Sequence, residues 1–123
     1  MGLPLNITVQ CTGSLIRLVV DGEVDLSTAP QLLVAIEAAV GAQVEIIEVD
    51  LSDVWFLDSS GVDALVEGQR AVNAHTAKLG YDCRLRIVRP ATPAAQVLRA
   101  AGVHGYLDVV EPPVVGGPVA AVS

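Results

Sequence analysis

Strand-like and helix-like segments alternate along almost the whole chain, and this alternation restricts the fold more than any other feature. After two β-branched runs, NITVQC and LIRLVVDG, the order is helix, strand, helix, strand, helix and a last short strand, YLDVVE. Parallel strands need long crossover connections, usually helices. The sequence therefore predicts one α/β domain with a four- or five-stranded mixed sheet, in which an opening hairpin precedes parallel strands and helices pack on one or both faces.

Short local signals mark the ends of the first elements. The stretch TGS at 12–14 separates the two opening runs and predicts a hairpin turn. Thr28 and Gln31 have the spacing of a capping box, which predicts that the first helix begins there, and Gly41 predicts its end. The stretch VEIIEVDLS that follows is rich in Val and Ile and predicts a central strand.

The second and third helices have boundary residues of the same kinds. The second helix is expected to begin at the segment DSSG and to run to about His75, and Gly80 is expected to close this unit. In the third helix, Thr92 is the predicted cap, Pro93 the first helical position, and Gly102 lies beyond the end.

The chain is expected to hold one domain followed by a short tail. Its 123 residues suffice for one hydrophobic core and are too few for two. Residues 1–111 form the predicted domain. The tail at 112–123, PPVVGGPVAAVS, has three prolines and two glycines in twelve residues and is expected to be loose.

Composition argues against two classes of partner. A net charge of -7, with fourteen acidic and seven basic residues, argues against nucleic acid, which needs clustered Lys and Arg. No apolar run approaches the roughly 18 residues of a membrane span. The start, MGLPLNITVQ, lacks an export signal, so a cytoplasmic location is expected. Cys11 and Cys83 are too few and too far apart for a metal site, and no cofactor is predicted.

The segment FLDSSGVDAL, residues 56–65, joins the end of a predicted strand to the start of a helix. Asp58, Ser59 and Ser60 stand side by side at this junction. One of them can cap the helix, because a side-chain oxygen can accept from an otherwise unpaired amide. Two hydroxyls and an acid exceed what one cap requires, so a nucleophile or an acceptor of phosphate stays open beside the purely structural role.

Catalysis by these serines is not supported by the rest of the sequence. The G-x-S-x-G pattern of a nucleophile elbow is absent. His75 would lie more than about 20 Å away along the helix that Ser59 starts, and His104 has no evident orienting acid. A phosphate-binding loop would need several glycines, whereas Gly61 stands alone. The protein is therefore expected not to be an enzyme.

A phosphorylation switch fits the junction better. Phosphate on an exposed hydroxyl adds a charge of about -1.5 to -2, which a helix N-terminus tolerates. A partner docked over that hydroxyl would have to bury the new charge. One modification can therefore separate a complex without unfolding either protein.

Three segments together resemble the STAS domain of bacterial anti-sigma factor antagonists. These are GEVDLSTAPQL, VEIIEVDLSDVWFLDSSGVDALV and LRIVRPATPAAQVLRAAGV. The resemblance runs from about Ile7 to Val110, and FLDSSG is its most specific part. Proteins of that family bind an anti-sigma factor with serine kinase activity, which frees the sigma factor and so regulates transcription.

The resemblance also implies roles for residues of this chain. The kinase would phosphorylate Ser59, the complex would dissociate, and a phosphatase would later reset the switch. Self-association as a homodimer stays open. The residues that map to the partner surface are Asp58, Ser60, Gly61, Asp21, Gly22, Glu23, Val24 and Asp25.

Two departures and two alternatives accompany the resemblance. The family usually ends in a packed helix, which the tail sequence would break, and Trp55 is bulkier than expected just before the motif. For Trp55, a place in the core is expected in preference to a role as an anchor for a partner. The same fold also serves as a constitutive accessory subunit, for example of a lipid-transport complex, and as a small-molecule or nucleotide sensor.

Overall fold

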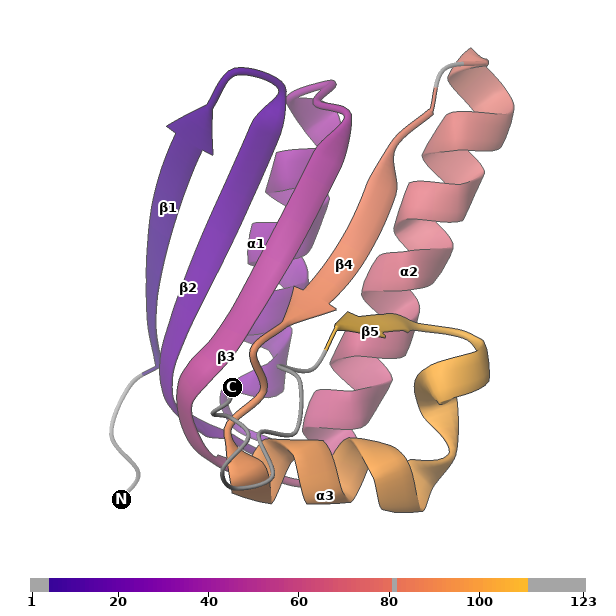
Figure 1. The fold of residues 1–123 in the computed structure, drawn as a ribbon. Helices are drawn as coiled ribbons and strands as arrows, with labels where there is room; N and C mark the ends of the chain where they lie inside the picture. Colours follow the sequence, from indigo (N-terminus) through magenta and orange to yellow (C-terminus); the bar gives the residue numbers. More distant parts are fainter. Residues whose placement is uncertain (1–4, 81, 111–123) are drawn as a thin grey trace, which may run out of the picture.

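A hairpin opens the chain and forms one side of a five-stranded sheet (Figure 1). The computed structural model describes residues 5–80 and 82–110. In chain order, its elements are β1 (Asn6–Thr12), β2 (Leu15–Val24), α1 (Ala29–Gly41), β3 (Ile46–Leu57), α2 (Ser59–Leu79), β4 (Arg84–Val88), α3 (Thr92–Ala101), the 3₁₀-helix η1 (Val103–Gly105) and β5 (Asp108–Val110).

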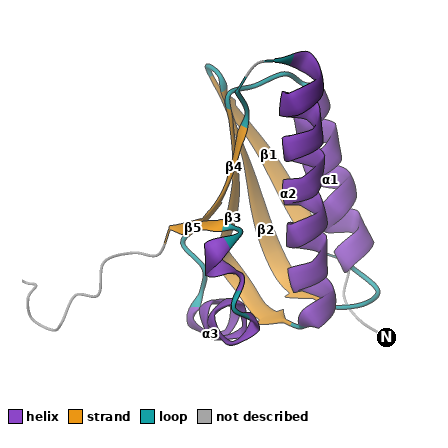
Figure 2. Ribbon diagram, turned by 90° about the vertical axis from the view of Figure 1, so that its right-hand side faces the viewer, coloured by secondary structure: helices purple, strands orange, loops and turns teal. Residues whose placement is uncertain are grey.

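The strands lie in the sheet in the order in which they occur in the chain, β1-β2-β3-β4-β5. β1 and β2 are antiparallel, and every later pair is parallel. The two crossovers through α1 and α2 step the same way across the sheet, so right-handed connections place these two helices on one face. Figure 2 shows α1 and α2 together on that face, and α3 lying near the end of the sheet. The predicted mixed α/β sheet is confirmed, with five strands.

The core lies between the sheet and the two long helices. Every second residue of the central strands points toward α1 and α2, as strand geometry requires. The side chains of Leu18, Ile47, Val49 and Ile87 are at most 1% exposed and face α1 and α2. The core is aliphatic, as expected for a chain with 3% aromatic residues.

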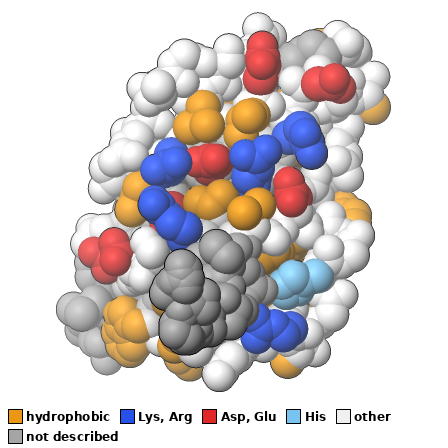
Figure 3. Space-filling model, viewed as in Figure 1, with side chains coloured by type: hydrophobic (Ala, Val, Ile, Leu, Met, Phe, Trp, Pro, Cys, Tyr) orange, Lys and Arg blue, Asp and Glu red, His pale blue; other side chains and the backbone are white. Residues whose placement is uncertain are grey.

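The opposite face of the sheet carries a ladder of charged side chains. Arg17, Glu48, Arg86 and Asp108 are neighbours across four adjacent strands. Glu48 binds Arg17 at 2.8 Å and Arg86 at 3.6 Å, and Arg86 lies 3.7 Å from Asp108. Figure 3 shows this face, with basic and acidic side chains among apolar ones. Alternating charge allows four charged side chains to share one row of the sheet.

Several predicted boundaries differ from the structure by a residue or more. The N-cap of α3 is Ala91, and Thr92 is already helical without a side-chain cap bond, so the prediction of Thr92 as cap is wrong. Gly80 and Gly102 do end α2 and α3, each in the left-handed conformation. The predicted tail at 112–123 lies outside the described residues.

Candidate functional site

The site is built where β3 ends and α2 begins. Asp58 is the N-cap of α2, and its Oδ1 accepts from the amide of Ser60 at 2.9 Å and from the amide of Gly61 at 3.3 Å. These two amides would otherwise lack a partner at the first turn of the helix. Of the three polar residues at the junction, Asp58 therefore supplies the cap, and both hydroxyls remain available for another role.

The two serines border different hollows, one on each side of α2. Ser59 is exposed and borders a hollow between α2 and α3, together with Val62 and Val97. Ser60 is half-buried and borders a hollow between α1 and α2, together with Leu26. Ser59 is therefore the more exposed of the two serines.

Gly61 brings the start of α2 close to the sheet. It is buried, and a Cβ at this position would lie 2.3 Å from Cδ1 of Leu57 and 2.9 Å from Cγ1 of Val24. Real Cβ atoms do not tolerate such distances, so only glycine fits without displacement of the core. Gly61 thus lets α2 start close to the C-terminal end of β3 and so fixes the position of the two serines there. Its predicted place in a partner surface stays a prediction.

Only the last residues of the segment from Asp21 to Asp25 lie next to the junction of β3 and α2. The Asp58 amide donates to the carbonyl of Val24 at 3.2 Å, which joins the end of β2 to the start of α2. Asp21 pairs instead with Asp53, five residues before Asp58 along β3. The structure therefore brings the end of this segment to the serines and leaves its first residue several strand positions away.

Gly22 has a conformation that suits glycine. Its φ is +124°, a value that residues with a side chain rarely adopt. The pairing of β2 with β3 is interrupted on both sides of this residue. Gly22 therefore accommodates an irregular pairing at the end of β2.

Asp25 organises the turn that precedes α1. Its Oδ1 accepts from the Ser27 hydroxyl at 2.8 Å and from the amides of Ser27 and Thr28 at 2.9 and 3.1 Å. These bonds, that from the Ser27 hydroxyl first, hold the pKa of Asp25 below its ordinary value against the opposing effect of desolvation. The carboxylate is therefore engaged within its own turn.

The capping box predicted at Thr28 and Gln31 is wrong. Thr28 is the N-cap of α1 but makes no side-chain cap bond. Its hydroxyl accepts from the Asp25 amide at 2.9 Å and donates to the carbonyl of Glu23 at 2.8 Å. The amide group of Gln31 donates to the carbonyl of Leu5. Tertiary partners therefore replace the local pair that the spacing suggested.

Trp55 and Phe56 are both exposed, at 58% and 44%, so the expectation of Trp55 in the core is wrong. Along β3, Val54 pairs with Gly22 and Phe56 pairs with Glu23, which leaves Trp55 as an extra residue opposite β2. Such a bulge interrupts the alternation of a strand. Val54 and Leu57 are buried on either side, and the two aromatic residues between them face solvent. A bulge cannot be identified from alternation alone, which is why sequence reasoning missed this pair.

Charge is distributed unevenly along the chain around the site. Residues 18–69 hold eleven of the fourteen Asp and Glu and none of the seven Lys and Arg. Six of the acids lie in the two segments of the site: Asp21, Glu23, Asp25, Asp53, Asp58 and Asp63. The two chain segments that form the site therefore carry acidic side chains and no basic ones.

Along α2, no histidine lies close enough to the serines to act as a base. His75 lies on the helix that Ser59 begins, over 20 Å from it at about 1.5 Å per residue. His104 lies in η1. Within residues 5–80 and 82–110, no group of three or more His, Cys, Asp or Glu is placed to hold a metal ion. None of the helices in these ranges has both the length and the apolar composition needed to cross a membrane.

Comparison with known proteins relates this chain to a described family of domains. A family model with the description "Mlab, STAS domain" matches residues 7–111, which is most of the chain. No curated protein sequence matches the chain.

Several solved structures resemble this one over most of their length. An anti-sigma factor antagonist from Mycobacterium paratuberculosis shares 26% sequence identity with a TM-score of 0.71, and the match covers 93% of this chain and 92% of that chain. A putative anti-sigma factor antagonist from Thermotoga maritima shares 14% identity with a TM-score of 0.72, over 88% and 87%. The unphosphorylated form of the anti-sigma factor antagonist SpoIIAA shares 18% identity with a TM-score of 0.68, over 94% and 96%. The last two establish likeness of fold.

Proposed function

The chain belongs to the STAS domain family, and from this premise we propose that it is an anti-sigma factor antagonist switched by phosphorylation of Ser59. In its unphosphorylated form it binds an anti-sigma factor with serine kinase activity and thereby frees a sigma factor. Phosphorylation ends the complex, and a phosphatase restores the binding form. The protein itself acts by binding and catalyses nothing, and its ATP-dependent kinase places the cycle in the cytoplasm.

The observation that carries this proposal is the position of Ser59. Its side chain is exposed, it is the first residue of α2, and it lies at the edge of the sheet that also carries the end of β2. A kinase can reach such a hydroxyl without unfolding the domain. The neighbouring Ser60 is half-buried and faces the other side of the helix.

Asp58 determines which way a phosphate on Ser59 would point. A phosphate at a helix start is normally stabilised by free amides, but here the carboxylate of Asp58 already accepts from the amides of Ser60 and Gly61. The two anions also repel each other. A phosphate on Ser59 is therefore held toward solvent, where a docked partner would have to bury it.

The size of the electrostatic penalty is sufficient for a switch. Burying an unpaired charge of about -2 costs several kcal/mol or more. A penalty of about 4 kcal/mol weakens binding by nearly a thousandfold. In this scheme the domain does not need to change shape, because the phosphate charge lowers the stability of the complex and not that of the fold.

The proposal is tested by phosphorylation in vitro. The full-length protein is incubated with ATP and, one at a time, with each anti-sigma factor kinase of its host, and the modified residue is located by mass spectrometry. We expect modification at Ser59, unchanged in Ser60→Ala and abolished in Ser59→Ala. Absence of modification at Ser59 with every kinase would overturn the proposal.

A second candidate function follows from the two hollows beside α2. The hollow between α1 and α2 has a mainly apolar lining that includes Leu26, Pro30 and Leu33, and the hollow between α2 and α3 includes Val62 and Val97. Such surfaces also suit a constitutive accessory subunit, for example of a lipid-transport complex. Copurification with a membrane transporter that is unaffected by Ser59→Asp would favour this function over the switch.

A further inference from the structure

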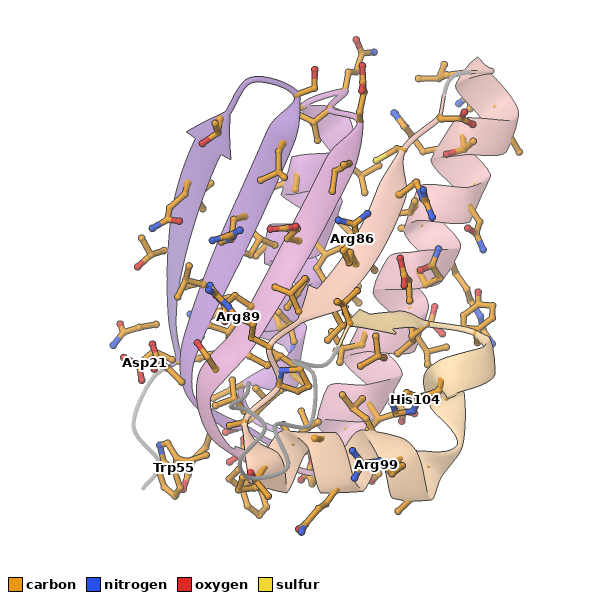
Figure 4. The ribbon with its side chains drawn as sticks, in the orientation of Figure 1. Asp21, Trp55, Arg86, Arg89, Arg99 and His104 are labelled. Carbon is orange, nitrogen blue, oxygen red and sulfur yellow. The ribbon has the colours of Figure 1, made fainter. Side chains whose placement is uncertain are left out.

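Three large apolar side chains are exposed beside the serine junction. Trp55 and Phe56 precede it on β3, and Leu26, 79% exposed, lines the hollow that Ser60 borders. Figure 4 shows Trp55 projecting from the lower end of β3, clear of the ribbon. We infer that these three residues are the anchor by which the protein binds its partner, and that the partner presents an apolar pocket bordered by Lys and Arg. This inference rests on the proposed function and specifies the partner surface that it requires.

The bulge at Trp55 gives the first argument for this anchor. A strand that continued in regular alternation from the buried Val54 would bury Phe56 and expose Leu57. The extra residue instead exposes Trp55 and Phe56 together and returns Leu57 to the core. Bulges often redirect side chains beside functional sites. The local irregularity therefore presents two adjacent aromatic side chains to solvent while the core beneath them stays closed.

The chemistry of the two side chains gives the second argument. Trp and Tyr, together with Arg, are the residues that most often dominate the energy of protein interfaces, and Phe is also enriched there. Trp55 is the single tryptophan of the chain and Phe56 its single phenylalanine. Although the chain has few aromatic residues, these two are consecutive and both exposed. Trp55 lies four residues before Ser59, and Phe56 lies three residues before it.

Charge identifies the kind of partner that fits this surface. Trp55 and Phe56 lie between Asp53 and Asp58 in the sequence, and Phe56 pairs across the sheet with Glu23. No Lys or Arg occurs between residues 18 and 69, and Arg89, whose charge reaches Asp53 from another segment, is already ion-paired with the buried Asp50. A complementary partner therefore carries basic side chains around its apolar pocket. The same acids disfavour an anionic membrane surface, which attracts basic segments.

Other exposed apolar side chains lie elsewhere and provide controls. Leu79, 47% exposed, stands at the last residue of α2, at the opposite end of the helix from Ser59. Its exposure matches that of Phe56, yet it borders neither segment of the site. Leu79→Ala therefore removes a similar apolar surface without touching the anchor.

The test measures affinity for the kinase that modifies Ser59, in the absence of ATP, by isothermal titration calorimetry with the full-length protein. We expect Trp55→Ala and Phe56→Ala each to weaken binding by about 30-fold or more, as for interface hot spots, and Leu79→Ala to change it by about twofold or less. Asp53→Lys, which reverses a charge beside the anchor, should weaken binding, and added NaCl should weaken binding of the unaltered protein.

The outcomes separate this inference from the proposed function. A kinase that modifies Ser59 but binds Trp55→Ala, Phe56→Ala and Leu79→Ala equally well overturns the anchor alone. If no kinase modifies Ser59, the proposed function fails and the anchor fails with it. Two further results overturn the anchor by showing another occupant. One is a dimer of the free protein, seen by sedimentation, that Trp55→Ala dissociates; the other is binding to phosphatidylglycerol vesicles that Trp55→Ala abolishes.

Discussion

The two halves of β3 differ in almost every structural respect, although they belong to one strand. Residues 46–50 pair in continuous register with β2 on one side and β4 on the other. Residues 53–57 pair with β2, with one register shift just before Asp53 and another between Val54 and Phe56, and they extend past β4. Ile47 and Val49 in the first half are fully buried, whereas Trp55 and Phe56 in the second half are exposed.

This difference shows how one strand can serve both stability and recognition. In the first half, neighbours on both sides fix the register, Ile47 and Val49 pack in the core, and Glu48 joins the charge ladder. In the second half, one neighbour is missing and extra residues are accommodated, so side chains are free to face a partner. If this division is correct, substitutions of buried residues in the first half change the free energy of unfolding, and substitutions of the exposed residues in or beside the second half change binding.

The largest expected effect follows from a charge placed directly after the second half. Ser59→Asp should weaken binding to the kinase by up to about a thousandfold, or about 4 kcal/mol, because the partner must bury an added anion beside Asp58. Ser59→Ala should retain the affinity of the unaltered protein. Both are measured by calorimetry with the purified kinase. Equal affinities for the two variants would contradict the electrostatic mechanism.

The second effect compares a core residue with an exposed one in the same strand. Ile47→Ala should lower the free energy of unfolding by about 2–5 kcal/mol, because it leaves a cavity between the sheet and the helices. Trp55→Ala should change it by about 0.5 kcal/mol or less, since the side chain is 58% exposed. Urea denaturation measures both. A loss for Trp55→Ala as large as that for Ile47→Ala would show that the second half also supports the fold.

The regular parts of the fold were predictable from sequence, for a reason that the first half of β3 illustrates. The order of strands and helices follows from periodicity, and a centrally placed, Val- and Ile-rich strand has few alternatives. The hairpin at 12–14 is confirmed, with Gly13 at a φ of +59°. Glycines that end helices, such as Gly80 and Gly102, were predictable because few other residues adopt that conformation.

The site was predictable only in part. The cap, the two hydroxyls and their place after a strand follow from DSSG, but which residue caps depends on geometry. Thr28 and Gln31 have the spacing of a capping box, yet both side chains bind carbonyls outside it, at Glu23 and Leu5. The exposure of Trp55 depends on pairing with β2, a contact between segments about thirty residues apart. Such long-range contacts leave no trace in local patterns.

A third effect concerns the acid that ends the first half. The carboxylate of Asp50 is 1% exposed, forms an ion pair with Arg89 and accepts from the Ser52 amide at 2.9 Å. Burial raises the pKa of Asp50, but the Ser52 amide and the Arg89 guanidinium outweigh it and hold the pKa below its ordinary value. Because the folded pKa is lower than the unfolded value of about 3.9, the stabilisation is present above that pH and is lost as pH falls through the folded pKa.

Asp50→Asn should therefore lower the free energy of unfolding by about 1.5–3 kcal/mol at pH 7 and make it less dependent on pH in the acid range. Urea denaturation between pH 7 and pH 3 measures both. Asp53→Asn, at an exposed position of the second half, is the matched control and should change stability by about 0.5 kcal/mol or less. A similar pH dependence in Asp50→Asn and the unaltered protein would exclude Asp50 as its source.

The smallest effect tests how the cap and the phosphate compete. Asp58→Ala should lower the free energy of unfolding by about 1 kcal/mol, because the amides of Ser60 and Gly61 lose their acceptor. In protein made with phosphoserine at position 59, the same substitution removes a neighbouring anion and frees two donors. The phosphate should then turn to the helix start, and the second pKa of the phosphate should fall.

An interaction with the helix dipole of about 0.3–1 kcal/mol corresponds to a fall of about 0.2–0.7 pH units. Titration by ³¹P NMR measures it, with the phosphoprotein that keeps Asp58 as the reference. Phosphorylation should also restore part of the stability lost in Asp58→Ala, because the phosphate takes over as cap, and it should add none where Asp58 is present. If the phosphate pKa is the same with and without Asp58, the phosphate does not contact the freed amides. The Asp58 cap would then not be the reason why the phosphate points toward solvent.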